Sequence, residues 1–558
     1  MPTLDWIGKD KAINHHLDVP YHVLERQYSY DEKGQHAEDN GSENMIIHGD
    51  NLSALKSLLP QYEGRIKCIY IDPPYNTGNE NWVYNDNVND PRIKKWLGEV
   101  VGKEGEDLSR HDKWLCMMYP RLKLLQRLLH DEGVIFISIG EDEIATLKII
   151  CDEIFGYNNR CGIVSRVMKS GGNKGNFFSP NIDYILVYCK NITFTHNFKA
   201  PLDEKIIKKL YTGIETDGPR KGQKYRPFGL YQSSLDERPN QRYYIECPDG
   251  TFAIPPGATM PTNIADGEKV LPMQGDGCWR WSAERYIEEK AKGSLLFKKS
   301  KGVLICPDGT PSKWNVYTKI WLDDRADEGQ TPTNLISAYE NRHSAKELTP
   351  LSIDFDFAKP SKLVEYLINI STTDKDAIIL DSYAGSGTTA HAVLNLNKTD
   401  GGRRKFILVE MMDYADSLTS ERVRRVITGC GEGKSKAEGT GGNFSYYELG
   451  DTLMNGNELN ETVGVDKIRE YVYFTETKSR LAPFKDDEPY YLGTHFTTAY
   501  YFYYDKENVT TLSRAFLHTI KTKADSYVIY ADLCTLSDAG LEKYHITFKK
   551  IPRDITKL

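Results

Sequence analysis

The chain has 558 residues, of which 27% are charged and 39% hydrophobic, and its formal net charge is −8 at pH 7. This length allows three or four domains, and the composition is typical of a soluble globular protein. We find no apolar run long enough to span a membrane, no signal peptide, and ten cysteines without a Cys-x-x-Cys pair; this predicts a reducing cytoplasm, no disulfides and no zinc site. The acidic balance argues against a generally basic nucleic-acid binder but does not exclude a local basic patch.

The first 44 residues are polar and predict a helical or irregular arm. Residues 45–48 form an apolar run that predicts a strand ending at Gly49-Asp50, and leucines then repeat at helical spacing from Leu52 to Leu59. Asp50 is therefore expected to be the N-cap of this helix.

The next apolar run, at residues 68–71, predicts a buried parallel strand that leads directly into Asp72-Pro73-Pro74-Tyr75. Ligand sites of α/β sheets lie at this end of the strands. A carboxylate and a proline carbonyl can accept the two hydrogens of an exocyclic amine, and the ring of Tyr75 can stack on a planar base. The prolines fix the backbone that presents these groups. A strand followed by a tight turn is the simpler alternative.

Residues 76–112 form a long charged connection, and this length favours a functional or mobile loop. Beyond it, the hydrophobic pattern predicts helices at 122–129 and 144–155, the second ended by Gly156, and a strand at 134–139. Residues 161–167 and 184–188 are predicted to form an antiparallel pair at the edge of the sheet.

Residues 191–340 depart from this α/β alternation. Glycine, proline, tryptophan and tyrosine are frequent, and short strands between turns are predicted, for example at 243–245 and 303–305. Trp279-Arg280-Trp281 places a cation between two aromatic side chains. We expect the tryptophans to be core residues rather than DNA contacts, because large aromatic side chains are mostly buried.

A second strand-and-turn motif is Ile378-Ile379-Leu380-Asp381-Ser382-Tyr383-Ala384-Gly385-Ser386-Gly387-Thr388-Thr389. Its glycines allow the backbone to approach a ligand closely, and the helix that follows presents free N–H groups to a carboxylate or phosphate. A nucleotide-hydrolysing phosphate loop would need a lysine that is absent here. Glu410 ends the next predicted strand at a spacing that suits an acid binding ribose hydroxyls. A Rossmann dinucleotide site would lack its third glycine, and a solvated strand end is the simpler alternative for Glu410.

Residues 429–442 predict a flexible linker. The tyrosine-rich tail beyond it has predicted strands at 497–504 and 527–531 and a predicted helix at 512–519. This pattern indicates a small α/β domain without catalytic residues of its own.

The two motifs together resemble those of the S-adenosylmethionine-dependent amino-methyltransferases of DNA. Because Asp-Pro-Pro-Tyr precedes the glycine motif, the order resembles that of the circularly permuted β class. The resemblance is closer still to the modification subunits of type III restriction-modification systems, and it covers about half of the chain. It rests on residues 48–55, 70–78, 114–122 and 137–143, on Phe357-Ala358-Lys359-Pro360, and on the sequence from there to about residue 427.

The resemblance implies a Rossmann-like α/β methyltransferase sheet with permuted motif order, an inserted β-rich target-recognition domain and a small C-terminal α/β domain. The implied parts are an N-terminal arm (1–44), the catalytic half of the methyltransferase domain (45–190), the target-recognition domain (191–340), the cofactor-binding half (341–430) and the C-terminal domain (431–558). In the closed sheet Asp50 is expected beside Glu410, and Asp72 beside the glycine turn.

The resemblance also implies a site-specific adenine N6-methyltransferase that binds S-adenosylmethionine and acts on a flipped adenine of double-stranded DNA. The implied catalytic residues are Asp72, Pro73, Pro74 and Tyr75. The implied cofactor-binding residues are Asp50, Asn51, Lys359, Pro360, Asp381, Tyr383, Gly385, Gly387, Thr388 and Glu410, with no metal. A homodimer and a helicase-nuclease restriction subunit are the implied partners, without a membrane.

Methylation of the exocyclic amine of cytosine would use the same pocket, but the family usually has serine at the position of Asp72 for that substrate. A nucleotide hydrolase and a DNA-binding protein without methylation activity are the alternatives from other classes. The missing loop lysine argues against the first, and the complete pocket argues against the second.

Overall fold

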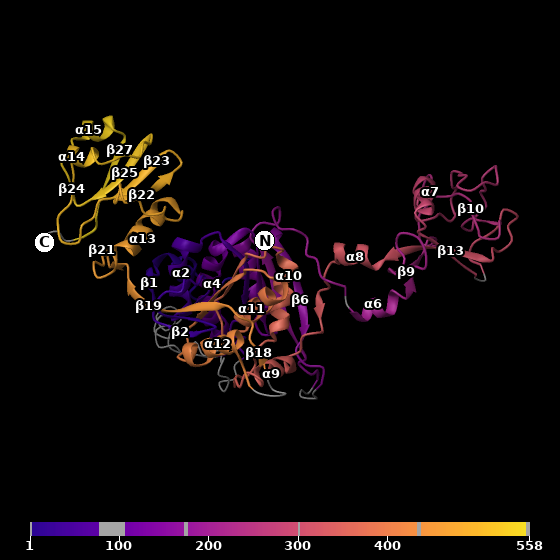
Figure 1. Ribbon diagram of the computed structural model, residues 1–558, viewed down its shortest axis with the longest axis horizontal. Coiled ribbons are helices and arrows are strands. Elements are labelled where there is room, and N and C mark those ends of the chain that lie inside the picture. Colours follow the sequence, from indigo (N-terminus) through magenta and orange to yellow (C-terminus); the bar gives the residue numbers. More distant parts are fainter. Residues whose placement is uncertain are drawn as a thin grey trace. The chain divides into compact units, whose positions relative to one another are not determined.

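A computed structural model of the chain describes residues 3–77, 107–171, 177–202, 204–299, 302–431 and 437–553. Met1–Asn197 and Thr333–Leu558 form one compact unit, and Phe198–Pro332 form another (Figure 1). The second unit lies inside the segment 191–340, and the division into five domains stays a prediction. Most of the loop predicted at 76–112 lies outside the described residues. Within the described ranges, no helix is long and apolar enough to cross a bilayer.

The first unit is built on an 11-stranded mixed sheet. In spatial order its strands are β14 (Leu335–Ile336), β6 (Arg160–Val167), β7 (Ile182–Cys189), β5 (Leu129–Ile139), β4 (Ile66–Ile71), β15 (Ile378–Asp381), β16 (Lys405–Glu410), β3 (Met45–His48), β19 (Asn443–Thr452), β1 (His22–Asp31) and β2 (Gly34–His36). The strands from β5 to β19 are parallel to one another. The pair β6–β7 is antiparallel, as predicted. The predicted α/β class is confirmed, and the sheet is mixed.

The pairing of β4, β15, β16 and β3 brings the predicted motifs together. β15 lies between β4 and β16, so the glycine turn follows a strand that neighbours the one ending before Asp72. On the other side, Glu410 is paired with His48, and the backbone N–H of Gly49 donates to the Glu410 carbonyl at 3.0 Å. Both predicted neighbourhoods, Asp50 with Glu410 and Asp72 with the glycine turn, are confirmed.

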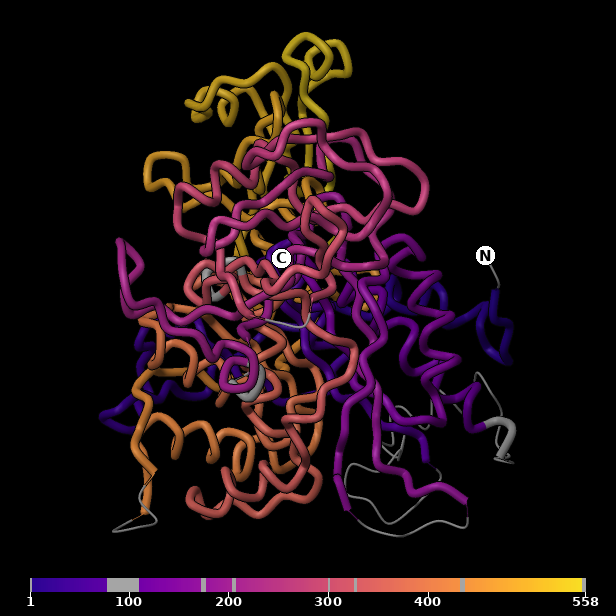
Figure 2. Tube along the Cα trace, turned by 90° about the vertical axis from the view of Figure 1, so that its right-hand side faces the viewer, coloured from indigo at the N-terminus to yellow at the C-terminus, as the bar shows by residue number. Residues whose placement is uncertain are grey.

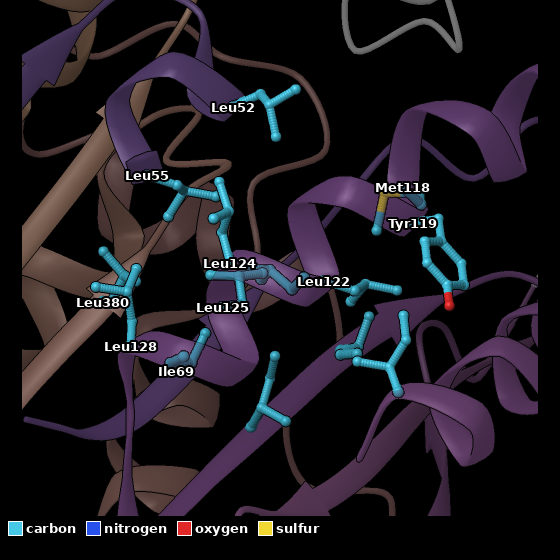
Figure 3. Close-up of a cluster of buried hydrophobic side chains, with 14 of the residues drawn as sticks. Leu52, Leu55, Ile69, Met118, Tyr119, Leu122, Leu124, Leu125, Leu128 and Leu380 are labelled. Carbon is cyan, nitrogen blue, oxygen red and sulfur yellow. The ribbon is translucent and has the colours of Figure 1, made fainter. Parts of the chain in front are cut away.

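Leucine-rich helices cover this part of the sheet. Figure 3 shows Leu52 and Leu55 of α2 lying with Leu122, Leu124, Leu125 and Leu128 of α4, and with Ile69 and Leu380 of two central strands. The helices of this α/β region are α1 (Lys9–Asp18), α2 (Asn51–Tyr62), α4 (Asp107–Leu128), α5 (Ile144–Cys151), α9 (Arg342–Leu348), α10 (Ser361–Ser371), α11 (Thr388–Asp400) and α12 (Glu421–Thr428). α5 continues into a π-helical turn that ends at Gly156, as predicted.

The N-terminal segment differs from the prediction. α1 agrees with a helical arm, but an irregular arm is wrong for His22–Asp31, which forms β1 and pairs with β19. β19 in turn runs parallel to β3, so it belongs to the main sheet although it lies beyond residue 431. These two strands cover the edge that β3 would otherwise expose, and Tyr28 stacks on Tyr446 at 5.1 Å between ring centroids. The predicted linker at 429–442 also contains two short paired strands, β17 (Gly429–Cys430) and β18 (Ala437–Glu438).

The tail is a smaller α/β arrangement within the first unit. Its sheet has the order β22 (Tyr491–His495), β23 (Thr498–Phe502), β25 (Ser526–Ala531) and β27 (Ile546–Lys550). The other elements are β20 (Met454–Asn455), β21 (Glu458–Leu459), α13 (Val465–Thr477), β24 (Thr511–Leu512), α14 (Arg514–Leu517), β26 (Leu533–Cys534) and α15 (Asp538–Lys543). Both predicted strands are confirmed, whereas the predicted helix at 512–519 is a single turn because Thr511–Leu512 pair with β26.

The second unit is rich in short strands and turns. One sheet has the order β12 (Leu295–Lys299), β13 (Trp314–Trp321), β9 (Lys224–Gly229) and β8 (Gly213–Ile214), and β10 (Ile245–Glu246) pairs with β11 (Phe252–Ala253). Its helices are α6 (Glu204–Leu210), α7 (Ala283–Ala291) and α8 (Leu322–Glu328). Trp279 is fully buried and donates from Nε1 to the Tyr243 carbonyl, so its predicted core role is confirmed. Trp281 and Trp314 are only partly buried.

Candidate active site

A cleft lies at the carboxyl ends of β4 and β15. The predicted site residues that line it are Asp72, Pro73, Pro74, Tyr75, Lys359, Asp381, Tyr383, Gly385 and Thr388. Phe355 and Phe357 add an apolar wall. Phe357 opens the motif quoted at 357–360, whereas no sequence motif indicated Phe355. The structure therefore gathers both predicted motifs around one cavity.

Only one of the two oxygens of the Asp72 carboxylate has a hydrogen-bond partner among the described residues. Its Oδ2 accepts a hydrogen bond from Lys359 Nζ at 2.5 Å, and the two side chains form an ion pair with exposed fractions of 21% and 8%. Its Oδ1 is buried and has no hydrogen-bond partner among the described residues. A buried acceptor without a donor is costly unless a ligand supplies one. Asp72 is thus held in place through Oδ2, and Oδ1 is the candidate acceptor for a hydrogen bond from a ligand.

The ring of Tyr75 is fixed from two sides. Its Oη donates to Asp183 Oδ2 at 3.2 Å, and Asp183 is itself held by the fully buried Arg166 through a bond of 2.8 Å from Nε to Oδ1. A Cβ on Gly140 would lie 3.0 Å from Tyr75 Cδ2, so the glycine makes room for the ring. Lys359 Nζ lies 5.0 Å from the ring centroid. Tyr75 is therefore an oriented flat wall of the cleft.

The turn after the two prolines is also anchored. The Pro74 carbonyl accepts from Trp114 Nε1 at 2.8 Å, which leaves the Pro73 carbonyl as the candidate acceptor for a substrate. Asn76 has φ 56°, a conformation that asparagine tolerates, and its amide donates to the fully buried Glu143. Glu143 also binds His111 Nδ1 at 2.6 Å.

The glycine turn between β15 and α11 is built on positive φ angles of 51° at Gly385 and 81° at Gly387. Arg422, fully buried, holds the turn by donating to Ser386 Oγ at 2.7 Å and Thr388 Oγ1 at 2.9 Å. Thr419 Oγ1 donates to the Gly385 carbonyl. The turn is therefore a fixed backbone surface at the N-terminus of a helix, where N–H groups can face an anionic group.

Two buried carboxyl groups support this turn. Glu410 Oε2 accepts from the Gly385 N–H at 2.7 Å, and Asp381 accepts from the Tyr383 N–H at 3.0 Å and from Thr389 Oγ1 at 2.6 Å. Burial raises the pKa of both groups to about 7. Glu410 contacts the turn and is not among the residues that line the cleft. A contact with a ribose hydroxyl would have to use a carboxylate lone pair that is not bonded to the turn.

Asp50 and Asn51 differ in their surroundings. Asp50 caps α2 by accepting from the Ser53 N–H at 2.9 Å, and it pairs with Arg121 at 3.0 Å. Asn51 is 2% exposed, and its side chain is bound between the Ser382 carbonyl and Arg121 Nε. The structure thus bears out the N-cap expectation for Asp50. The side chain of Asn51 points into the protein, where it links α2 to the residue after β15, and it does not line the cleft.

Several supporting residues were not predicted, chiefly Arg166, Asp183, Glu143, Arg121 and Arg422. Each is a charged group that is at most 3% exposed. Charged residues are almost never fully buried unless they are paired, but the sequence does not indicate which charges are buried. Gly140, which makes room for Tyr75, does have a sequence signal, because it directly follows the predicted strand at 134–139.

Comparison with known proteins gives one family. Residues 66–474 match the model of a family described as DNA methylase. The Mod subunit of the type III restriction-modification enzyme StyLTI of Salmonella typhimurium is 33% identical over 76% of this chain and 62% of its own length. The EcoPI Mod subunit of Escherichia phage P1 is 31% identical over 73% of this chain and 63% of its own. The matches thus span less than two thirds of these type III relatives.

A shorter relative is matched over more of its length. The type II methyltransferase M.KpnI of Klebsiella pneumoniae is 31% identical over 69% of this chain and 84% of its own length. Among solved structures, a putative DNA modification methylase from Thermus thermophilus, complexed with S-adenosyl-L-methionine, has 13% identity and a TM-score of 0.31, covering 73% of this chain and 99% of its own. The cytosine-N4-specific PvuII DNA methyltransferase has 12% identity and a TM-score of 0.32, covering 68% and 86%.

Proposed function

Because this chain belongs to the DNA methylase family, we propose that it transfers a methyl group from S-adenosylmethionine to the exocyclic amine of adenine in double-stranded DNA, as the modification subunit of a restriction-modification system. The observation that carries the proposal is Asp72, which lines a cleft shared with the glycine turn and whose buried Oδ1 has no hydrogen-bond partner among the described residues. The type III Mod subunits among the relatives support the system to which it is assigned.

The chemistry follows from the nucleophile. The adenine amine is a weak nucleophile because its lone pair is conjugated into the ring. Asp72 Oδ1 and the Pro73 carbonyl accept its two hydrogens, which favours a pyramidal nitrogen and aims the lone pair at the methyl group. Lys359 balances the negative charge of Asp72 through its contact with the second carboxylate oxygen. The methylated amine loses its extra proton after the methyl transfer. Orientation of the two reactants supplies most of the gain in rate.

Tyr75 binds the extrahelical base. Taking a base out of the duplex costs a few kcal/mol, and stacking on an aromatic ring returns roughly 1–3 kcal/mol. The ring is already oriented by Asp183 and Gly140 before the base arrives. Little reorganisation is then needed when the base stacks.

We also assign the cofactor to this cleft. S-adenosylmethionine, when bound, supplies an electrophilic methyl group on a sulfonium. Gly385 lines the cleft, and both Gly385 and Gly387 have positive φ angles; we assign them to cofactor binding with Asp381, Tyr383, Thr388, Lys359 and Pro360. Asp50 and Glu410 are assigned to its adenine and ribose. Asn51 acts through Arg121 and Ser382. The catalytic motif precedes the cofactor motif in the chain, which is the permuted order of the β class.

The second unit is assigned to target recognition. A groove in it is lined by seven lysine and arginine side chains and two acidic ones, against the negative charge of the whole chain. Arg280 lies 4.2 Å from the Phe228 centroid, and Arg285 lies 5.2 Å from that of Trp281. Cations neutralise phosphates and aromatic faces stack on bases, so the groove suits DNA. Exchanging 198–332 for the segment of a related enzyme should change the methylated motif but keep adenine as the base.

We assign the assembly by family as well. The chain acts as a homodimer in the cytoplasm, where its DNA is, and associates with a helicase-nuclease restriction subunit. The tyrosine-rich tail is assigned to dimer or partner contacts, because aromatic side chains are enriched at interfaces.

Native DNA sequencing of cells expressing the chain, with mass analysis of the nucleosides, tests the function. We expect N6-methyladenine at one sequence motif. N4-methylcytosine instead, or no methylated base together with sequence-specific DNA binding, would overturn the assignment in favour of the two alternatives.

A further inference from the structure

Two adjacent phenylalanines, Phe177 and Phe178, stand almost fully in solvent, with exposed fractions of 93% and 92%. They belong to the connection between β6 and β7, which is closed by a hydrogen bond from the Met168 N–H to the Asn181 carbonyl. Exposing two neighbouring aromatic rings is unfavourable in water. Their neighbours Ser179 and Asn181 are polar, so the rings do not extend a broad apolar surface.

This connection lies at the same edge of the sheet as the cleft. β4 is parallel to β5, and β5 is antiparallel to β7, so β7 begins at the edge where β4 ends. The second residue of β7, Asp183, binds Tyr75 directly. Four residues lie between Phe178 and Asp183, and the five steps of chain from one to the other span at most about 18 Å. The two rings are thus tied closely to the wall on which the base would stack.

The base of the connection is firmly held. Asn341 N–H donates to the Met168 carbonyl at 2.8 Å, and Ser170 Oγ donates to Glu340 Oε2 at 3.1 Å. Arg166, which orients Asp183, also donates to Asn341 Oδ1 at 2.9 Å. Figure 2 shows β6 and β7 running side by side in purple to the start of this connection. The rings therefore sit on an arm that shares its anchor with Tyr75.

We propose that Phe177 and Phe178 insert into the DNA base stack beside the target adenine and hold it open while the adenine occupies the cleft. The inference rests on the proposed function. Apolar side chains pushed between base steps unstack and kink the duplex, and a base that leaves the stack removes a stacking partner that an aromatic ring can replace. Two rings with polar neighbours suit a gap between bases better than a protein interface, which needs a larger apolar core.

The test uses the full chain with Phe177→Ala and Phe178→Ala combined, on two duplexes that carry the methylated motif. In one duplex the target adenine is paired, and in the other it faces an abasic site and is already unpaired. On the paired duplex we expect kcat/KM to fall about 10- to 100-fold. On the abasic duplex we expect it to stay within about threefold of the wild type, because opening is no longer needed. Calorimetric affinity for S-adenosylmethionine should not change.

A matched control is Phe194→Ala. Phe194 is 59% exposed in the turn that follows β7, at the edge of the sheet opposite to the cleft. It should leave methylation of both duplexes unchanged, and Phe177→Trp with Phe178→Trp should restore activity on the paired duplex. A double alanine variant that matches the wild type on paired DNA, that loses activity equally on both duplexes, or that changes only the solution mass would overturn the inference. A wild-type chain that methylates no DNA would overturn the proposed function instead, and this inference with it.

Discussion

At the scale of single residues, the pair of Asp72 and Lys359 links activity to stability. We predict that Asp72→Ala lowers methyl transfer about 100-fold or more, because the amine loses its acceptor, while S-adenosylmethionine still binds. Lys359 is 8% exposed, so the same change leaves a buried charge and costs about 1–3 kcal/mol of stability. Adding Lys359→Met should recover stability but not activity. Wild-type rates of adenine methylation by Asp72→Ala would refute the role of this residue.

Tyr75 allows stacking to be separated from hydrogen bonding. Tyr75→Ala should cost about 1–3 kcal/mol of base stacking, so that kcat/KM falls roughly 5- to 150-fold. Tyr75→Phe keeps the ring and loses only the 3.2 Å bond to Asp183, and we expect a change below about threefold. Steady-state kinetics on one duplex compare the two variants, and equal losses in both would argue against stacking.

The buried acids predict a pH dependence of stability. The folded-state pKa values of Asp381 and Glu410 are raised from 3.8 and 4.5 to about 7. The folded chain therefore binds more protons than the unfolded chain between about pH 4 and 7. The contribution of these groups to stability falls as pH rises through this window and is constant above it. Urea unfolding at pH 5, 6, 7 and 8 measures the slope, which Asp381→Asn should reduce. An unchanged slope in this variant would place the titration elsewhere.

At the scale of elements, the glycine turn between β15 and α11 can be tested against a glycine of the same conformation. Gly385→Val should abolish measurable S-adenosylmethionine binding. The valine side chain would stand where the backbone lines the cleft, and a β-branched residue is strained at a φ of 51°. Gly401 ends α11 at φ 66° with no atom within 4 Å of an added Cβ. Gly401→Val should pay a similar backbone cost of about 1–3 kcal/mol and still bind the cofactor. Calorimetry on both folded variants decides, and unchanged affinity in Gly385→Val would remove the turn from the site.

The elements that the sequence predicted well have simple hydrophobic patterns. β4, β15 and β16 are continuous apolar runs, and the glycine turn has a distinctive composition. β1 was missed because His22–Asp31 is mostly polar and only its pairing with β19 buries Tyr28. The anchor of Tyr75 could not be predicted either, since Arg166 and Asp183 meet only through the register of two strands. Asn51 was assigned to the cofactor by resemblance, but its orientation depends on Arg121, 70 residues away.

At the scale of the whole molecule, β19 sets where the chain can be divided. A chain ending at Gly442 would remove a strand that pairs with both β3 and β1, and we predict that it fails to fold. A chain ending at Thr462 keeps this strand and should remain folded, although less stable, because Leu453 and Leu459 lose buried neighbours. Circular dichroism and thermal melting compare the two. A cooperative transition in the shorter chain would contradict the role of β19.

The chain ending at Thr462, compared with the full chain, also tests the tail as a dimer contact. Light scattering should give a dimer for the full chain and a smaller mass for the chain ending at Thr462. A dimer that survives this truncation, or a full-length monomer, would each assign the contact to another surface.

The order of strands also has a consequence for synthesis on the ribosome. β3 is made early, but its partner β16 follows much later, and Asn44 binds the backbone of Phe406 across 362 residues. At about 5–20 residues per second, Met45–His48 waits roughly 20–70 s for β16, and the edge of Ile66–Ile71 that β15 will cover waits roughly 15–60 s, although β5 follows sooner on its other edge. During that delay their edges are open to wrong pairing, so a nascent chain of this protein depends on chaperones or on rapid translation through the inserted unit.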